Sequence, residues 1–342
     1  MKKPKFIIFN DMHLDSNNGQ AILVSIDHML NYAVENNIKN IVLAGDALIS
    51  RSAQRLNTFE TLDKMIQMFD EAGVVLWIVP GNHDKTDYDS SYSFLEVYRY
   101  HPRVKFFKTL KKVVIEGVDV TLLPFFSDEV LIPLINEAEG GDVLISHFEM
   151  MGSENAGSIS NKNTITERML RKWKKVYLGH YHDTHEITKD IVHLPSLRQA
   201  KFKENANKGF SIIYDDFSYE IIKGKFREYT IVEIDLDSQD LDNIKDLIDA
   251  FQKLDASIRF EITGEESKLK AFDKNIFEDS GIQVKILFSK TKDEKTLIQP
   301  NIIKKYDKKQ VGEKLKIFCN EKGYSYERGA VYFEDFMKDK DG

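Results

Sequence analysis

Short apolar runs alternate with amphipathic stretches through residues 6–79, and this alternation is the feature that most constrains the fold. Runs with the length and composition of buried strands occupy residues 6–10, 41–44 and 74–79. Between them, apolar residues recur every three or four positions at 22–33 and 59–69, the spacing of one helix face. This order predicts βαβ units and a parallel sheet covered by helices.

The pattern of apolar and polar residues changes twice after residue 79. Short strand-like runs become denser between residues 104 and 222, with helix-like stretches expected at 128–139 and 164–175. After residue 228 a strand, helix, strand, helix, strand order predicts a separate small α+β module. With 342 residues, the chain is long enough for more than one domain. We therefore expect domains at 1–228 and 229–290, followed by a C-terminal segment, helical and basic, at 291–342.

Net charge and cysteine content exclude some classes of protein. The net charge of −7 excludes a histone-like binder and leaves room only for local basic patches. The single cysteine, Cys319, cannot close an intrachain disulfide, which fits a reducing compartment. Since we find neither a secretory signal nor a long apolar span, we expect no membrane association. The predicted location is the cytoplasm, of a bacterial cell or of a phage-infected host.

Five short polar motifs stand directly after apolar runs. In an open α/β sheet, ligands collect at the carboxyl ends of the strands, so these motifs would meet at one rim. Each motif alone is weak, because a single histidine or Gly-Asp pair after a strand is commonly structural. Together they would supply about eight carboxylate, amide and imidazole groups. The motifs are Asp11-Met12-His13, Gly45-Asp46, Gly81-Asn82-His83-Asp84, His147 and Gly179-His180-Tyr181-His182.

The chemistry of these groups predicts a binuclear metal site. Carboxylate oxygen and imidazole nitrogen suit divalent ions such as Mn, Fe or Zn, and the lack of thiolates argues against a structural zinc cage. Two ions bridged by a carboxylate turn a shared water into a hydroxide near neutral pH, a nucleophile for phosphorus. The expected cofactors are two divalent ions, Mn²⁺ first, with Mg²⁺, Fe²⁺ and Zn²⁺ as alternatives.

In this order, the five motifs resemble those of the calcineurin-like metallophosphoesterase superfamily. The resemblance implies an α/β fold, a four-layer core with two central sheets flanked by helices. It implies that one metal is bound by Asp11, His13 and His182, and the other by Asn82, His147 and His180. It further implies that Asp46 bridges the ions, and that His83 contacts the phosphate and protonates the leaving oxygen as general acid.

Within the superfamily, the chain resembles the SbcD family of DNA nuclease subunits, including phage recombination endonuclease subunits. Residues 193–197 and 208–214 look like the closing strands of that family, and a small capping domain follows them, as at 229–290 here. The protein phosphatase branch is disfavoured because Asp46 is followed by Ala-Leu-Ile-Ser, without that branch's Asp-Arg-Gly, and because Asp84 stands where the branch has Glu.

One position departs from the family. Three residues after the bridging aspartate, many members carry an Asp or His that orients the histidine of Gly-Asn-His, whereas this chain has Ile49. An isoleucine side chain can neither donate nor accept a hydrogen bond. The orientation of His83 therefore requires another group, for which Asp84, Ser50 and Arg51 are the candidates.

The resemblance also implies partners. Members act as homodimers on DNA, bound to an SbcC-type coiled-coil ATPase. A basic segment offers a phosphate-contact surface, with an exposed helix face as the equal alternative: Arg168, Arg171, Lys172, Lys174 and Lys175. In the C-terminal segment, apolar residues among lysines would dock on the ATPase or pack on the cap: Ile302, Ile303, Tyr306, Val311, Leu315 and Phe318. The six lysines of 304–316 favour a solvated helix face over a DNA contact.

The leading hypothesis is thus the nuclease subunit, with exo- or endonuclease activity, of an SbcCD-like recombination and repair complex. A stand-alone phosphodiesterase acting on cyclic nucleotides or other small diesters is the alternative, and residues beyond 228 argue against it. A scaffold subunit with a vestigial site is the third hypothesis. The presence of all five motifs argues against this hypothesis, whereas the apolar residue Ile49 at the position of the usual orienting group argues for it.

Overall fold

The computed structural model describes residues 2–155, 158–159 and 164–288. The first of its two six-stranded sheets has the strand order β14-β13-β1-β2-β3-β4. Strands β1 to β4 run parallel, and β13 pairs antiparallel with both β1 and β14. The strands are β1 (Pro4–Phe9), β2 (Asn40–Ala44), β3 (Val75–Val79), β4 (Val104–Phe106), β13 (Gly209–Tyr214) and β14 (Tyr219–Lys223).

The second sheet has the order β11-β12-β10-β7-β6-β5. Its four inner strands, β12, β10, β7 and β6, run parallel, and an antiparallel strand closes each edge. The strands are β5 (Lys111–Ile115), β6 (Val118–Leu123), β7 (Gly141–Ser146), β10 (Trp173–Leu178), β11 (His185–Thr188) and β12 (Ile191–His193). A two-stranded ribbon, β8 (Glu154–Asn155) and β9 (Ser158–Ile159), lies in the connection between β7 and β10.

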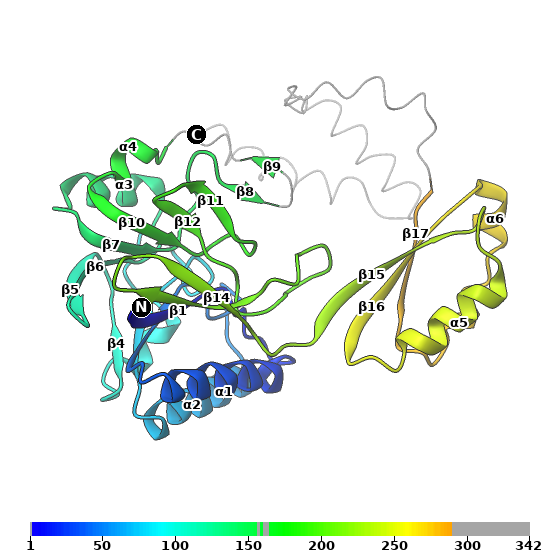
Figure 1. The fold of residues 1–342 in the computed structure, drawn as a ribbon, viewed down its shortest axis with the longest axis horizontal. Coiled ribbons are helices and arrows are strands. Elements are labelled where there is room, and N and C mark those ends of the chain that lie inside the picture. Colours follow the sequence, from blue (N-terminus) through cyan, green and yellow to red (C-terminus); the bar gives the residue numbers. More distant parts are fainter. Residues whose placement is uncertain (1, 156–157, 160–163, 289–342) are drawn as a thin grey trace, which may run out of the picture. The chain divides into compact units, whose positions relative to one another are not determined.

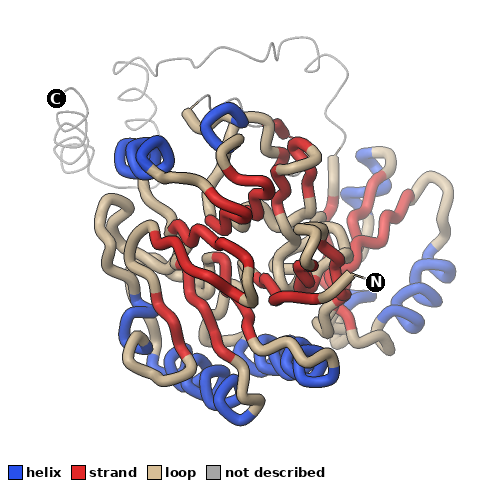
Figure 2. The backbone as a smooth tube through the Cα atoms, turned by 60° about the vertical axis from the view of Figure 1, so that its left-hand side comes forward, coloured by secondary structure: helices blue, strands red, loops and turns tan. Residues whose placement is uncertain are grey.

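Helices cover the outer faces of the two sheets (Figures 1 and 2). Helices α1 (Gly19–Glu35) and α2 (Leu56–Glu71) pack side by side on the first sheet, and α3 (Asp128–Glu137) with the short α4 (Glu167–Leu170) covers the second. A 3-10 helix, η1 (Phe94–Tyr98), precedes β4. These elements confirm the predicted α/β core of two central sheets flanked by helices.

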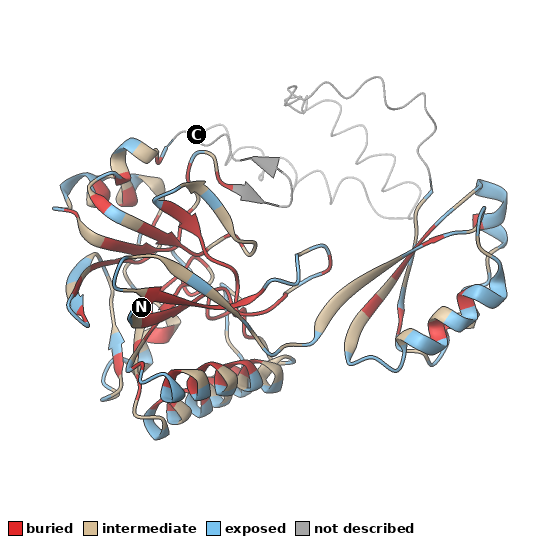
Figure 3. Ribbon diagram, viewed as in Figure 1, coloured by how far each residue is buried: buried red, intermediate tan, exposed pale blue. Residues whose placement is uncertain are grey.

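Side-chain alternation along the inner strands creates the layers. On β1, Phe6 and Ile8 belong to the core between the sheets, whereas Ile7 and Phe9 face the helices. All four are at most 1% exposed. Because successive residues of a strand point to opposite faces, a strand covered on both sides must be apolar throughout. This explains the unbroken apolar runs at 6–9 in β1, 41–44 in β2 and 143–145 in β7, which lie at the buried centre of the core (Figure 3).

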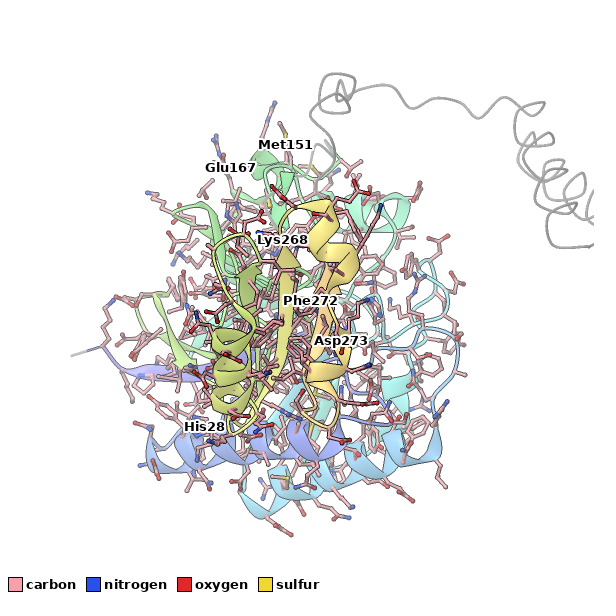
Figure 4. All side chains as sticks on the ribbon, turned by 90° about the vertical axis from the view of Figure 1, so that its right-hand side faces the viewer. His28, Met151, Glu167, Lys268, Phe272 and Asp273 are labelled. Atoms are coloured by element: carbon pink, nitrogen blue, oxygen red, sulfur yellow. The ribbon has the colours of Figure 1, made fainter. Side chains whose placement is uncertain are left out.

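A third sheet, β15-β16-β17, is entirely parallel and has its own apolar core. Its elements are β15 (Glu228–Asp235), α5 (Leu241–Phe251), β16 (Ala256–Thr263), α6 (Glu266–Ala271), η2 (Lys274–Phe277) and β17 (Gln283–Ile286). Lys268 on α6 pairs with Asp237, and Phe272 follows directly after the helix (Figure 4). The predicted β-α-β-α-β order is present, while the domain boundaries stay predictions. The C-terminal segment from residue 289 lies outside the described residues.

The expected helix over residues 164–175 is wrong. Helix α4 ends at Leu170, and β10 begins at Trp173, which pairs in register with Gly141 of β7. Burial of the Trp173 side chain, whose Nε1 donates to Thr121 Oγ1, stabilises the strand. Sheet pairing therefore overrides the helical spacing of the basic residues.

Four of the five basic residues of this segment, all except Arg168, have hydrogen-bond or ion-pair partners that the structure shows. Lys172 Nζ donates to three carbonyl oxygens at the end of α3, those of Ile135, Asn136 and Ala138, at 2.7, 3.0 and 2.9 Å. In addition, Arg171 pairs with Glu167, Lys174 pairs with Asp142, and Lys175 donates to the Lys189 carbonyl. A cation at a helix C-terminus satisfies carbonyls that have no partner inside the helix. A DNA-contact role for the segment stays a prediction.

No helix in the described part of the chain is long and apolar enough to span a membrane.

Replacing Lys172 by methionine keeps most of the aliphatic stem and removes the three donors. Because hydrogen bonds to charged groups contribute about 1.5–3 kcal/mol, we expect Lys172→Met to lower the free energy of unfolding by about that amount. The control is Lys174→Met, which removes an exposed ion pair and should cost less than about 1 kcal/mol. Urea denaturation of both variants measures the difference. Equal losses would contradict a capping role for Lys172.

Candidate metal centre

The five polar motifs meet at one edge of the two sheets because each follows the carboxyl end of a parallel strand. Asp11 and His13 follow β1, Asp46 follows β2, and Asn82 and His83 follow β3. His147 follows β7, and His180 and His182 follow β10. Three overlapping groups have ligand atoms within 4.8 Å of one another: Asp11, His13 and His182; His13, Asp46 and His83; Asp11, Asp46 and His147.

The loops that carry these residues have unusual backbone geometry. Asp11, His13, Asp46 and His180 all have positive φ, at 50°, 46°, 51° and 86°. Each such residue costs on the order of 1–3 kcal/mol, and strain of this kind concentrates at functional sites. Backbone hydrogen bonds hold the first two loops together, from Asp11 N to Gly45 O at 3.0 Å and from His13 N to Asp46 O at 3.1 Å.

Two glycines allow the ligand side chains to approach the backbone closely. A Cβ atom on Gly45 would lie 2.1 Å from His147 Nδ1, and one on Gly81 would lie 2.2 Å from Asp46 Oδ1. Both distances are far shorter than any van der Waals contact. The glycines of Gly-Asp and Gly-Asn-His-Asp are therefore needed for the placement of the acidic and imidazole groups, and not only for turns.

One set of donor atoms surrounds Asp11. Its Oδ1 atom is buried, accepts no hydrogen bond within the described part of the chain, and lies 3.8 Å from His13 Nε2 and 3.9 Å from His182 Nε2. The two Nε2 atoms are themselves only 2.9 Å apart. A buried polar atom without a partner is costly, so its presence indicates a missing ligand. An oxygen and two imidazole nitrogens aimed at one point can coordinate a divalent ion.

A second set surrounds Asn82. Its Oδ1 atom lies 3.1 Å from His147 Nε2 and 3.1 Å from His180 Nδ1. Asp46 stands between the two sets, with Oδ1 at 3.2 Å from His147 Nε2 and Oδ2 at 3.8 Å from His13 Nε2. From this position Asp46 would be able to contribute to both sets of donor atoms if each held an ion.

Outer hydrogen bonds fix the orientation of two imidazoles. His147 Nδ1 donates to the Ala44 carbonyl at 2.9 Å, and His182 Nδ1 lies 2.5 Å from Glu204 Oε1. A carbonyl oxygen can only accept, so Nδ1 of His147 carries a hydrogen and Nε2 is the ring nitrogen that faces the site. Such outer partners set the tautomer and the basicity of metal-binding histidines.

Sequence analysis missed two residues that support the site. Burial alone would raise the pKa of Glu204, but the hydrogen bond with His182 lowers it to about 2, so the side chain is a carboxylate. The buried Arg198 donates to the carbonyls of Met12 and His13 at 3.2 and 3.4 Å, and so holds the first motif loop. Neither residue belongs to a motif, and each reaches the site through the tertiary fold alone.

The electrostatics of the site follow from burial and from the two aspartates. Burial lowers the pKa of His13 and of His180 to about 4, so both rings are neutral and able to act as ligands. Burial would also lower the pKa of His147, but Asp46 and Asp11 raise it to about 9. In the metal-free protein a proton on His147 thus offsets part of the carboxylate charge, and a bound cation would replace that proton.

His83 finds its orienting partner in the backbone. Its Nδ1 atom donates to the carbonyl oxygen of Ile49 at 2.7 Å, and its backbone N–H donates to Asp46 Oδ1 at 2.9 Å. The Ile49 side chain itself is 43% exposed. Asp84, one of the candidate substitutes, instead accepts from Leu48 N and Gly81 N at 3.0 and 2.8 Å. The missing polar side chain at position 49 is therefore replaced by a main-chain acceptor.

Two facing sheets with a buried carboxylate–imidazole cluster at the carboxyl ends of their strands define a metal-dependent phosphoesterase. Residues 4–205 match the family described as calcineurin-like phosphoesterase, and the chain belongs to this family. It is also similar to exonuclease subunit 1 of Enterobacteria phage T4, with 23% identity over 165 residues. That match covers 47% of this chain and 48% of the phage protein, so the chain spans about half the length of this relative.

Removal of the Glu204 carboxylate should weaken metal binding. Loss of an outer partner of a metal-binding histidine typically reduces metal affinity by about 10- to 100-fold, so we expect this range for Glu204→Gln. Calorimetric titration of the metal-free protein with Mn²⁺ measures the effect. Glu186→Gln, which alters a carboxylate bonded to Tyr219 on β14, is the matched control. Unchanged affinity in Glu204→Gln would contradict the assigned role.

Proposed function

We propose that this chain is a metal-dependent DNA nuclease, the nuclease subunit of an SbcCD-like recombination and repair complex. The observation that carries the proposal is the convergence of the motif side chains: six of them, including Asp11 and Asp46, cluster together, and the Asn82 side chain contacts His147 and His180 beside them. The similarity to exonuclease subunit 1 of Enterobacteria phage T4 supports a nuclease, and the resemblance to the SbcD family supports DNA as the substrate. The proposed activity is hydrolysis of phosphodiester bonds, as an exo- or endonuclease.

The residues fit two divalent ions. Asp11, His13 and His182 would hold one ion, and Asn82, His147 and His180 the other, with Asp46 between them. The buried, unpartnered Asp11 Oδ1 and the mixture of oxygen and nitrogen donors support this assignment. When bound, such ions neutralise the charge of a phosphodiester and supply an activated water at neutral pH. Mn²⁺ is the first choice on this ligand chemistry, and Mg²⁺, Fe²⁺ and Zn²⁺ are the alternatives.

His83 would act on the leaving oxygen. Its Nδ1–H donates to the Ile49 carbonyl, which fixes the ring plane and leaves Nε2 as the atom available to substrate. In the protonated ring Nε2 carries the second proton, which it can transfer to the oxygen that departs from phosphorus. The hydrogen bond from the His83 backbone to Asp46 keeps this ring beside the site.

The family resemblance supports the proposed partners. We propose DNA as substrate, a homodimer as the working state, and an SbcC-type coiled-coil ATPase as the partner subunit, in the cytoplasm. Residues 291–342, the proposed docking segment for that ATPase, lie outside the described part of the chain.

Two variants separate chemistry from metal binding. Asp46→Asn should abolish Mn²⁺-dependent cleavage of labelled single- and double-stranded DNA and lower the amount of bound metal. His83→Gln should keep the metal and lower cleavage by about 100- to 10,000-fold, because only a proton donor is lost. Asp27→Asn and His28→Gln on α1 are the matched controls, and Figure 4 labels His28. Bis-p-nitrophenyl phosphate serves as a generic diester in the same assays.

Two outcomes would contradict the proposal. Hydrolysis of the small diester without DNA cleavage, even with an SbcC-type ATPase and ATP present, would indicate a small-molecule phosphodiesterase. Absence of any hydrolysis, with no bound metal in the purified protein, would indicate a scaffold subunit with a vestigial site.

The backbone contact to His83 makes a prediction for position 49. Ile49→Ala keeps the carbonyl acceptor, so its DNA cleavage rate should stay close to that of the unmodified protein. If Ile49→Ala lost activity to the extent of His83→Gln, the side chain and not the carbonyl would be orienting the histidine. The circular dichroism spectrum of each variant provides the check on folding.

A further inference from the structure

A cavity of about 340 Å³ opens beside Asn82 and His180, next to the metal-binding groups. Aromatic side chains form much of its wall, contributed by three separate loops: Tyr88, Phe125, Phe126 and Phe148. The volume is at the lower end of those that hold small ligands. None of these aromatic residues belongs to the five motifs, so the chemistry assigned above leaves the cavity unexplained.

The aromatic rings continue from the metal-binding groups into the cavity. The Phe125 and His180 rings are nearly parallel, with an interplanar angle of 20° and centroids 6.4 Å apart. Tyr88 then meets Phe125 edge-on, at 72° and 4.8 Å. Aromatic rings in this arrangement suit a planar aromatic ligand, because stacking against the rings would stabilise the bound ligand.

The wall is held in place by hydrogen bonds. Phe125 N donates to Pro80 O at 2.9 Å, and Ser127 N donates to Tyr88 O at 3.2 Å. Below them the buried Lys85 donates to the carbonyls of Ser90 and Phe125, with its Nζ atom 3.7 Å from the centroid of the Phe126 ring. The cavity is thus preformed, because two of its three aromatic loops, those of Tyr88 and Phe125, are joined to each other and to the end of β3.

The charge of the lining selects against a phosphate inside the cavity. Asp128, Glu129 and Glu149 contribute carboxylates, and Ser127 contributes a hydroxyl. Negative groups repel a phosphate, whereas they accept hydrogen bonds from amino groups and ring N–H groups. The fitting occupant is therefore neutral, planar and equipped with donors, and it is attached to a phosphate that lies at the metal-binding groups outside.

We propose that this cavity binds the base of a nucleotide whose phosphate lies at Asn82 and His180. The inference rests on the proposed nuclease function and adds a substrate preference to it. A base stacked within a duplex cannot reach such a cavity unless it leaves the stack, which costs a few kcal/mol. The enzyme therefore favours single-stranded DNA and frayed ends, where the base is already free.

Binding of mononucleotides tests the cavity without depending on catalysis. In calorimetry with the Mn²⁺-loaded protein, deoxyadenosine 5′-monophosphate should bind about tenfold more tightly than deoxyribose 5′-phosphate, which lacks the base. Tyr88→Ala should remove most of this difference, whereas Tyr88→Phe, which keeps the ring, should retain it. Tyr92→Ala removes a 71% exposed tyrosine outside the cavity and is the matched control.

The outcomes separate this inference from the nuclease assignment. Equal affinity for the two ligands in the unmodified protein would overturn the base-binding cavity, whatever the fate of DNA, and this comparison needs no variant to fold. An equal loss in Tyr88→Ala and Tyr92→Ala would overturn it as well. A base-dependent affinity that is lost in Tyr88→Ala supports it, even in a protein that hydrolyses only small diesters, and in that case the nuclease assignment alone fails.

Discussion

The buried pair of carboxylates, Asp11 and Asp46, is the constraint on which the rest of the site depends. Their side chains are 0% and 3% exposed. Two negative charges buried side by side are unfavourable unless positive charge neutralises them. The surrounding imidazoles offset only a part of this charge: burial keeps His13 and His180 neutral, whereas the two aspartates raise the pKa of His147, so that this ring carries a proton. Bound cations would offset the remaining negative charge of this cluster, and divalent ions suit its mixture of oxygen and nitrogen donors.

The two sheets make this arrangement possible. Parallel strands place successive loops at the same edge of a sheet. Strands β1, β2 and β3 of one sheet and β7 and β10 of the other therefore all end next to the motif residues. Positive φ angles at four ligands and the absence of a Cβ atom at Gly45 and Gly81 then bring side chains from both sheets together. The apolar cores on either side of each sheet, built by simple alternation along β1, β2 and β7, hold the strained loops in place.

Local signals in the sequence were sufficient to predict the core and the strand ends at which the motif residues lie. Each motif directly follows an apolar run, so its place at a strand end depends only on nearby residues. Features that depend on tertiary contacts were not predictable. Glu204 and Arg198 reach the site from a distant loop, and the basic residues around Lys172 join a strand because Trp173 packs into the second sheet. Ile49 is the clearest case: its side chain suggested a missing partner for His83, and the carbonyl that serves instead is present in every residue type.

Under the two proposals above, reaction chemistry and substrate choice would be carried by different parts of this chain. The carboxylate and imidazole groups would act on a phosphodiester, and this unit is common to DNA and to many small molecules. These groups therefore cannot by themselves select a substrate. The cavity beside Asn82 and His180 is built from the segments around Tyr88, Phe125 and Phe148, which lie outside the motifs. Since loop residues vary more freely than the strands that support them, a family with one reaction can acquire many substrates in this way. The motifs identify the class of enzyme because they contain the residues of the reaction. The proposed substrate preference instead rests on aromatic residues that no motif contains.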